Sequence, residues 1–97
     1  MAAVVYAARS LVQLERAVGD LGGDGPAAAL AAASAIGSAF ELLAAHPLLG
    51  RRIHGDIREL VISYGRTGYV ALYRFVVPRD ELRILAIRPQ RALGFVP

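Results

Sequence analysis

Ninety-seven residues are enough for one hydrophobic core and too few for two, so the sequence predicts a single domain spanning residues 1–97. The chain has no cysteine, which excludes disulfides and cysteine-bound zinc, and we expect neither a metal ion nor a cofactor. Residues 1–50 carry a net charge of −2 and residues 51–97 a net charge of +5, and all 11 basic residues are arginine. This asymmetry fits an anionic partner, either nucleic acid or an acidic protein segment, and equally a solvated surface.

The N-terminal half predicts one strand and a helical hairpin. Residues 2–8 form a short apolar run, which predicts a first strand. Ser10, followed three residues later by Gln13, forms a capping-box pattern that opens a helix over residues 10–21. Residues 22–26 predict a loop, and Pro26 occupies the first position of a second helix that ends before Pro47.

The second helix is rich in alanine, and its apolar stripe is expected on one side. The predicted stripe consists of Leu30, Ala33, Ile36 or Gly37, Phe40 and Leu43. The low-charge run over residues 25–40 has neither the length nor the hydropathy of a membrane span. No basic region precedes an apolar stretch at the N-terminus, so we expect no signal peptide, no membrane partner and a cytoplasmic protein.

The C-terminal half predicts three more strands. Residues 48–56 form a connecting segment, residues 57–64 a strand, and residues 65–68 a glycine-containing turn. Residues 69–77 are apolar on both faces apart from Arg74, which predicts a central strand in which Arg74 pairs with a carboxylate such as Glu59. After a turn at 78–81, residues 82–88 predict the last strand, and the tail over 92–97 has no regular pattern. The expected order is therefore β-α-α-β-β-β in an α+β fold.

Four groups of residues resemble the ParE/RelE superfamily of toxins from bacterial type II toxin–antitoxin systems, which includes the plasmid stabilisation type. The groups are Pro47 with Gly50-Arg51, Ile57-Arg58-Glu59-Leu60, Gly68-Tyr69 with Tyr73-Arg74, and Ile84-Leu85-Ala86-Ile87 followed by Arg88 and Arg91. Each group alone has low specificity, whereas their order and spacing cover nearly the whole chain.

The resemblance implies a helical hairpin packed on a small, largely antiparallel four-stranded sheet, in which the first strand pairs with a later one. It also implies a cognate antitoxin as partner. RelE-like members cut messenger RNA in the ribosome, and ParE-like members poison DNA gyrase.

The residues at the chemical positions favour the ParE-like branch. The loop before the predicted 57–64 strand carries Arg51, Arg52 and His54 but no lysine, and the residue after Tyr69 is Val70 rather than an arginine. Cleavage at a ribose hydroxyl needs a proton acceptor, a proton donor and charge stabilisation, and arginine supplies only the last of these. We expect His46 to end the second helix.

Two sets of candidate site residues follow. The catalytic candidates are His54, Arg88 and Arg91, and the target- or nucleic-acid-binding candidates are Arg51, Arg52, Arg66, Arg88 and Arg91. The preferred hypothesis is a gyrase-binding toxin neutralised by a cognate antitoxin. The alternatives are a ribosome-dependent endoribonuclease and a degenerate, non-toxic module that binds the antitoxin.

Overall fold

The computed structural model describes residues 1–21, 25–64 and 67–90. In chain order, the elements are β1 (Ala3–Tyr6), α1 (Ala8–Leu21), α2 (Pro26–Ala45), β2 (Arg51–His54), β3 (Ile57–Tyr64), β4 (Thr67–Val76), the 3-10 helix η2 (Val77–Arg79) and β5 (Glu81–Pro89). Residues 22–24, 65–66 and 91–97 lie outside the described ranges, and so do parts of the predicted 22–26 loop and 65–68 turn and all of the predicted irregular tail.

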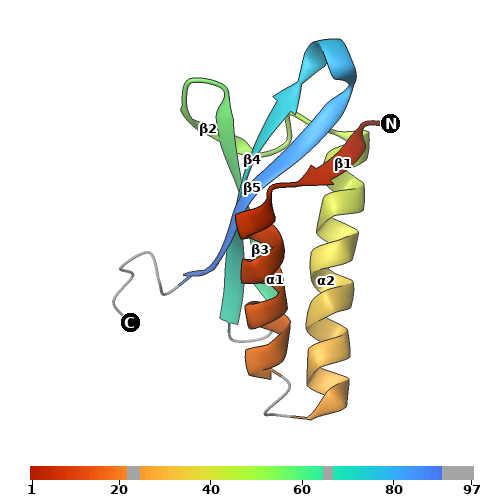
Figure 1. Ribbon diagram of the computed structural model, residues 1–97, viewed down its shortest axis with the longest axis vertical. Coiled ribbons are helices and arrows are strands. Elements are labelled where there is room, and N and C mark those ends of the chain that lie inside the picture. Colours follow the sequence, from red (N-terminus) through yellow and green to blue (C-terminus); the bar gives the residue numbers. More distant parts are fainter. Residues whose placement is uncertain (22–24, 65–66, 91–97) are drawn as a thin grey trace.

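The strands form one sheet in the order β1-β5-β4-β3-β2 (Figure 1). β1 runs parallel to β5, and the other neighbouring pairs are antiparallel. The predicted α+β fold is therefore confirmed, including a first strand that pairs with a later one. The predicted count of four strands is wrong, because residues 51–54, expected in a connecting segment, form the edge strand β2. All four residues of β2 are exposed, so their sequence lacks the alternation of apolar and polar residues that marks a half-buried strand.

Both helices lie on the same side of the sheet (Figure 1), α1 against β5 and α2 against β3. The core between the layers takes Ile36, Phe40 and Leu43 from α2 and the fully buried Tyr73 from β4. Tyr6 joins it from β1, with its ring 5.8 Å from that of Phe40 in an edge-to-face arrangement. Fully burying side chains of this size contributes about 1.5–3 kcal/mol each, so this layer holds the hairpin on the sheet.

The stripe predicted for α2 is partly wrong. The buried residues are Ala32, Ile36, Phe40, Leu43 and Ala44, whereas Leu30 is 73% exposed and Ala33 is also exposed. The prediction failed because apolar residues surround this helix on every side, so periodicity alone does not select a face. By length and composition alone α2 is also long and apolar enough to cross a membrane, and in the folded domain its buried side packs on the sheet.

The first residues of α1 and α2 were both predicted, and only the prediction for α2 agrees with the structure. Gly25 precedes α2 with a φ of 112°, which glycine adopts without strain, and Pro26 takes the first helical position as predicted. The capping box predicted for α1 is wrong, because the helix already begins at Ala8 and the buried Ser10 hydroxyl donates to the Ala7 carbonyl at 2.7 Å. Gln13 instead accepts a hydrogen bond from the Ile87 N–H of β5 at 2.8 Å.

The turn that connects β4 to β5 lies close to the turn predicted at residues 78–81. η2 (Val77–Arg79) is followed by Asp80 in the left-handed region, with a φ of 46°. Aspartate is among the few residues besides glycine that tolerate this conformation. The turn brings β5 back beside β4. The Asp80 carbonyl also accepts a hydrogen bond from the Ala3 N–H at the start of β1.

Candidate binding face of the sheet

The face of the sheet that turns away from the helices carries most of the described arginines of the C-terminal half. Side chains alternate between the two faces of a strand. Because Tyr73 points to the helices, Arg74 points away from them, and its neighbours in the register are Ile57 on β3 and Arg83 on β5. His54 lies opposite Ile57 and extends this row to the edge. We call this surface the arginine face; its charged members are Arg51, Glu59, Arg74, Glu81, Arg83 and Arg88, and His54 lies at its edge.

Three of these arginines are held by carboxylates. Arg51 pairs with Glu59. Arg74 Nε contacts Asp56 Oδ1 at 3.0 Å, so the predicted pairing of Arg74 with a carboxylate is confirmed, but the partner is Asp56 and Glu59 was the wrong example. The register explains the difference, since it places Leu72 rather than Arg74 opposite Glu59.

The third pair joins Arg83 to Glu81 on β5 at 2.6 Å. Arg74 and Arg83 face each other directly across β4 and β5. Like charges in that position repel, and each guanidinium has its own carboxylate, Asp56 for Arg74 and Glu81 for Arg83. The partly exposed pairs therefore fix the directions of the side chains more than they stabilise the fold.

Arg52 and Arg88 make no ion pair within the described ranges. Successive residues on β2 point to opposite faces, so Arg51 and Arg52 do not form one patch. Arg88 lies opposite Val70 on β4 and is exposed. It shares the arginine face with Arg51, three strand spacings away, or roughly 15 Å. The predicted residues Arg66 and Arg91 lie outside the described part of the chain.

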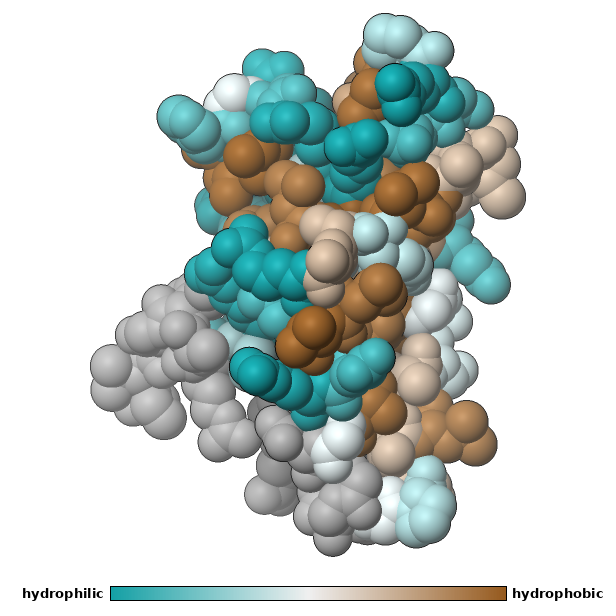
Figure 2. Space-filling model, in the orientation of Figure 1, coloured by the Kyte–Doolittle hydropathy of each residue, from teal (hydrophilic) through white to brown (hydrophobic). Residues whose placement is uncertain are grey.

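Apolar residues lie between these charges. Val61 of β3 is half exposed, and Leu72 of β4 is partly exposed on the same face. Figure 2 shows hydrophilic and hydrophobic residues side by side in the upper half of the view, where Figure 1 places β2, β4 and β5. The surface is therefore equipped for apolar contact as well as for charge.

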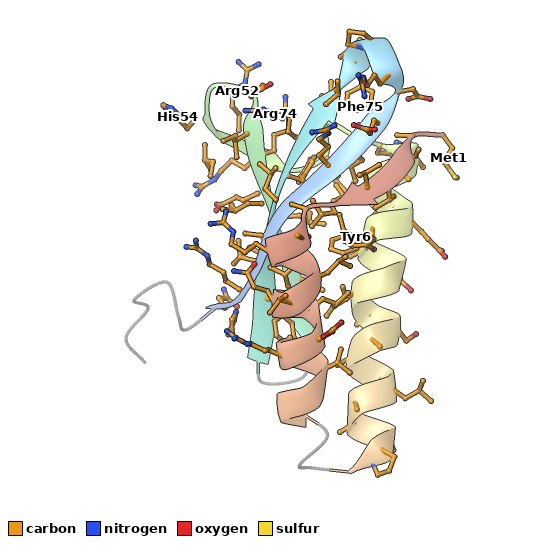
Figure 3. The ribbon with its side chains drawn as sticks, in the orientation of Figure 1. Met1, Tyr6, Arg52, His54, Arg74 and Phe75 are labelled. Atoms are coloured by element: carbon orange, nitrogen blue, oxygen red, sulfur yellow. The ribbon has the colours of Figure 1, made fainter. Side chains whose placement is uncertain are left out.

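His54 lies at the outer margin of this surface. Figure 3 shows His54, Arg52 and Arg74 at the same end of the sheet, with His54 farthest out. His54 is exposed, and its side chain makes no ion pair or hydrogen bond with another described residue. His46 follows α2 as its C-cap, as predicted, and its N–H donates to the Leu42 carbonyl at 2.9 Å.

Sequence reasoning missed a hydrogen-bonded cluster where β2 begins. The Gly50 N–H donates to the Tyr73 hydroxyl at 2.7 Å, and Arg58 Nη1 donates to the Gly50 carbonyl at 2.8 Å and to the Leu48 carbonyl at 3.3 Å. We call Gly50, Arg58 and Tyr73 the Gly50 cluster. A Cβ on Gly50 would lie 2.6 Å from the Glu59 carbonyl oxygen and from the Tyr73 ring, so only glycine fits. The available signal in the sequence was Arg58, a charged residue at the second position of the predicted 57–64 strand.

The environment of Tyr73 keeps its hydroxyl neutral. Burial raises the pKa of Tyr73, and the Gly50 hydrogen bond and the nearby Arg58 charge offset part of that rise. Burial also raises the pKa of Tyr6. Tyr69 of β4 is buried as well, and its hydroxyl donates to the Ala17 carbonyl of α1 at 3.5 Å. These three tyrosines point into the core rather than onto the arginine face.

Comparison with known proteins identifies the family. The model of the ParE toxin of type II toxin–antitoxin systems, parDE, matches residues 4–93. The chain belongs to the ParE toxin family. The match includes both helices and the described strands, apart from the first residue of β1. The resemblance to ParE/RelE toxins is thereby confirmed.

A curated relative carries the other name of the superfamily. Toxin RelE3 of Caulobacter vibrioides (strain ATCC 19089 / CIP 103742 / CB 15) is 48% identical over 63 residues, which is 65% of this chain and 66% of that toxin. The chain thus spans just under two thirds of the length of this relative. The two names together establish a toxin of the ParE/RelE kind without selecting a target.

Proposed function

We propose that residues 1–97 act as one toxin domain that binds and poisons DNA gyrase in the cytoplasm and is neutralised by a cognate antitoxin. The support for a binding mechanism is the composition of the arginine face. Its cations are guanidinium groups, which stay protonated and do not shuttle protons at neutral pH. Tyr6, Tyr69 and Tyr73 point into the core, away from these cations.

The antitoxin part of the proposal rests on the family. A type II antitoxin that covers the arginine face or the exposed edge at β2 would block access to the target. Acidic groups of such a partner complement the excess of arginine in the second half of the chain.

The relative named Toxin RelE3 favours the alternative of a ribosome-dependent endoribonuclease. In that case Arg51, Arg88 and His54 are the residues to supply charge stabilisation and proton transfer, with Arg91 as a further candidate from the sequence. Of these four residues, His54 alone has a ring with both a proton-donating and a proton-accepting nitrogen in its neutral form. A non-toxic, antitoxin-binding module is the third alternative.

Expression in the absence of antitoxin, combined with an in vitro assay, tests the proposal. We expect filamentous growth with DNA-damage signalling, and inhibition of supercoiling by purified gyrase. The variant R51A/R88A should inhibit gyrase on the order of tenfold less, because it removes two cations from the arginine face. R9A, which removes an exposed arginine on α1, is the matched control and should inhibit as wild type does.

Two other outcomes would overturn the proposal. Untouched supercoiling together with cleaved ribosome-bound messages identifies the endoribonuclease, and H54A then abolishes cleavage if His54 transfers a proton. Normal growth with retained antitoxin binding identifies the non-toxic module.

A further inference from the structure

Two adjacent leucines are exposed where the chain passes from α2 to β2. Leu48 is 63% exposed and Leu49 is 49% exposed. Leu42, one helical turn before His46, is exposed to a similar degree. Single exposed apolar residues are ordinary, whereas adjacent ones mark interaction surfaces when the backbone prevents them from turning inward.

The backbone of this corner is held by hydrogen bonds on both sides. Leu49 N–H donates to the His46 carbonyl at 3.0 Å, and Gly50 N–H donates to the buried Tyr73 hydroxyl at 2.7 Å. Arg58 binds the carbonyls of Leu48 and Gly50. Pro47 fixes one further backbone angle. The two leucines are therefore presented to solvent by a segment with little freedom to rearrange.

Positive charge adjoins the leucines. Residues 46–54 contain Arg51, Arg52 and two histidines and no carboxylate. Glu59 offsets Arg51, whereas Arg52 is exposed and makes no ion pair within the described residues. Three residues of extended chain separate Leu49 from Arg52, a distance of about 10 Å.

This combination fits a protein better than a nucleic acid. Phosphates would satisfy the arginines but would leave both leucines in contact with water. Bases bind to single-stranded sites mainly by stacking on aromatic rings, and residues 46–54 contain no phenylalanine, tyrosine or tryptophan, only the smaller imidazole rings of two histidines. An acidic peptide with a large apolar side chain satisfies both features at once.

We propose that Leu48 and Leu49, together with Arg52, form a docking site for an acidic protein segment that carries a large apolar side chain. The leucines provide the desolvated contact, and Arg52, which lies beside Arg58 in the register, steers the segment and fixes its orientation. The Gly50 cluster keeps the site in its binding geometry before the partner arrives, which lowers the entropy lost on binding. This inference goes beyond the proposed function, since it does not require gyrase to be the target.

Peptide selection tests the site without gyrase. A displayed library of random dodecapeptides is selected on the wild-type protein, with no counter-selection on the leucine variants. We expect the enriched peptides to combine aspartate or glutamate with leucine, isoleucine or phenylalanine. A selected peptide should bind L48S/L49S at least about tenfold more weakly, bind R52A more weakly at low salt, and lose affinity as salt is raised.

L30S is the matched control, because it replaces an exposed leucine near the opposite end of α2, and it should bind the peptide as wild type does. Circular dichroism and thermal unfolding establish that the variants fold. If the double variant does not fold, L48S alone is used, since it changes the more exposed leucine.

Three results would overturn the proposal: enriched peptides without acidic residues, equal peptide affinity for wild type and L48S/L49S, or a short single-stranded RNA that binds more tightly than any selected peptide and loses affinity in L48S/L49S. Failure of gyrase inhibition alone leaves the peptide result unchanged, so the two proposals fail separately.

Discussion

The N–H of Gly50 and the hydroxyl of Tyr73 lie 2.7 Å apart in the protein interior, although 23 residues separate them in the sequence. This hydrogen bond ties the corner before β2 to the central strand. It gives the buried hydroxyl of Tyr73 a donor and gives the Gly50 N–H an acceptor that the sheet does not supply.

Removing this hydroxyl should destabilise the protein without changing its packing. In Tyr73→Phe the ring remains and the Gly50 N–H loses its partner in a buried place, so we expect a loss of about 1–3 kcal/mol in the free energy of unfolding. Urea denaturation measures the loss, and an unchanged dependence on urea concentration shows that the folded state is still compact. Equal stability of the two proteins would contradict the assigned role.

The absence of a side chain at position 50 should also be required. Gly50→Ala places a Cβ 2.6 Å from the Glu59 carbonyl oxygen and the Tyr73 ring, and we expect a loss of about 1–3 kcal/mol or more. Gly37→Ala is the control. Position 37 lies in α2 with no atom within 4 Å of the added Cβ, so alanine should stabilise the protein by about 0.5–1 kcal/mol. Losses of similar size at both positions would refute the packing argument.

Arg58 and Tyr73 should act together because both bind Gly50. In a double-mutant cycle with Arg58→Met and Tyr73→Phe, we expect a coupling energy of about 0.5–3 kcal/mol. A cycle of Arg9→Met with Tyr73→Phe provides the control, since Arg9 is exposed on α1, and its effects should add within about 0.5 kcal/mol. Additivity in both cycles would mean that the two contacts to Gly50 are independent.

Stability should decline at alkaline pH because buried tyrosines resist ionisation. The pKa values of Tyr6 and Tyr73 are raised in the folded state above 10.0. The unfolded state therefore releases protons first, and the free energy of unfolding, fully present below pH 10, falls as pH rises beyond it. Denaturation at several pH values measures this, and Tyr73→Phe should show a shallower decline. Parallel declines for wild type and Tyr73→Phe would contradict the shift assigned to Tyr73.

The ion pairs of the arginine face should matter little for stability. Arg74 and Asp56 are both substantially exposed, so Asp56→Asn should change the free energy of unfolding by less than about 1 kcal/mol. Thermal unfolding at low and high salt checks this. A larger loss that persists at high salt would indicate that the pair is structural.

Most elements were predictable because their apolar patterns are long. The β3 strand matches its predicted bounds, and β4, β5 and α2 lie close to theirs. The β2 strand was missed because its four residues depend on contacts distant in sequence: pairing with β3 and the anchoring of Gly50 by Tyr73 and Arg58. Such a strand has no local signal.

The site was less predictable than the fold, because a residue's partner depends on register. Arg74 was expected to meet a carboxylate such as Glu59, and a difference of two residues in strand pairing gives it Asp56 instead. The same register separates Arg51 from Arg52, which are adjacent in sequence but point to opposite faces. The sequence alone also does not indicate that Gln13 meets β5 instead of capping α1.

The position of β1 has a consequence for the timing of folding during synthesis. β1 pairs with β5 alone, through contacts such as Tyr6 with Ile84, and Ala3 N–H is held by the Asp80 carbonyl. β1, which is translated first, therefore cannot form its backbone hydrogen bonds with the sheet until β5, the last strand, has been translated. Because contacts between distant parts of a chain form slowly, the helical hairpin is complete early, while the arginine face acquires its final shape only after β5 has left the ribosome.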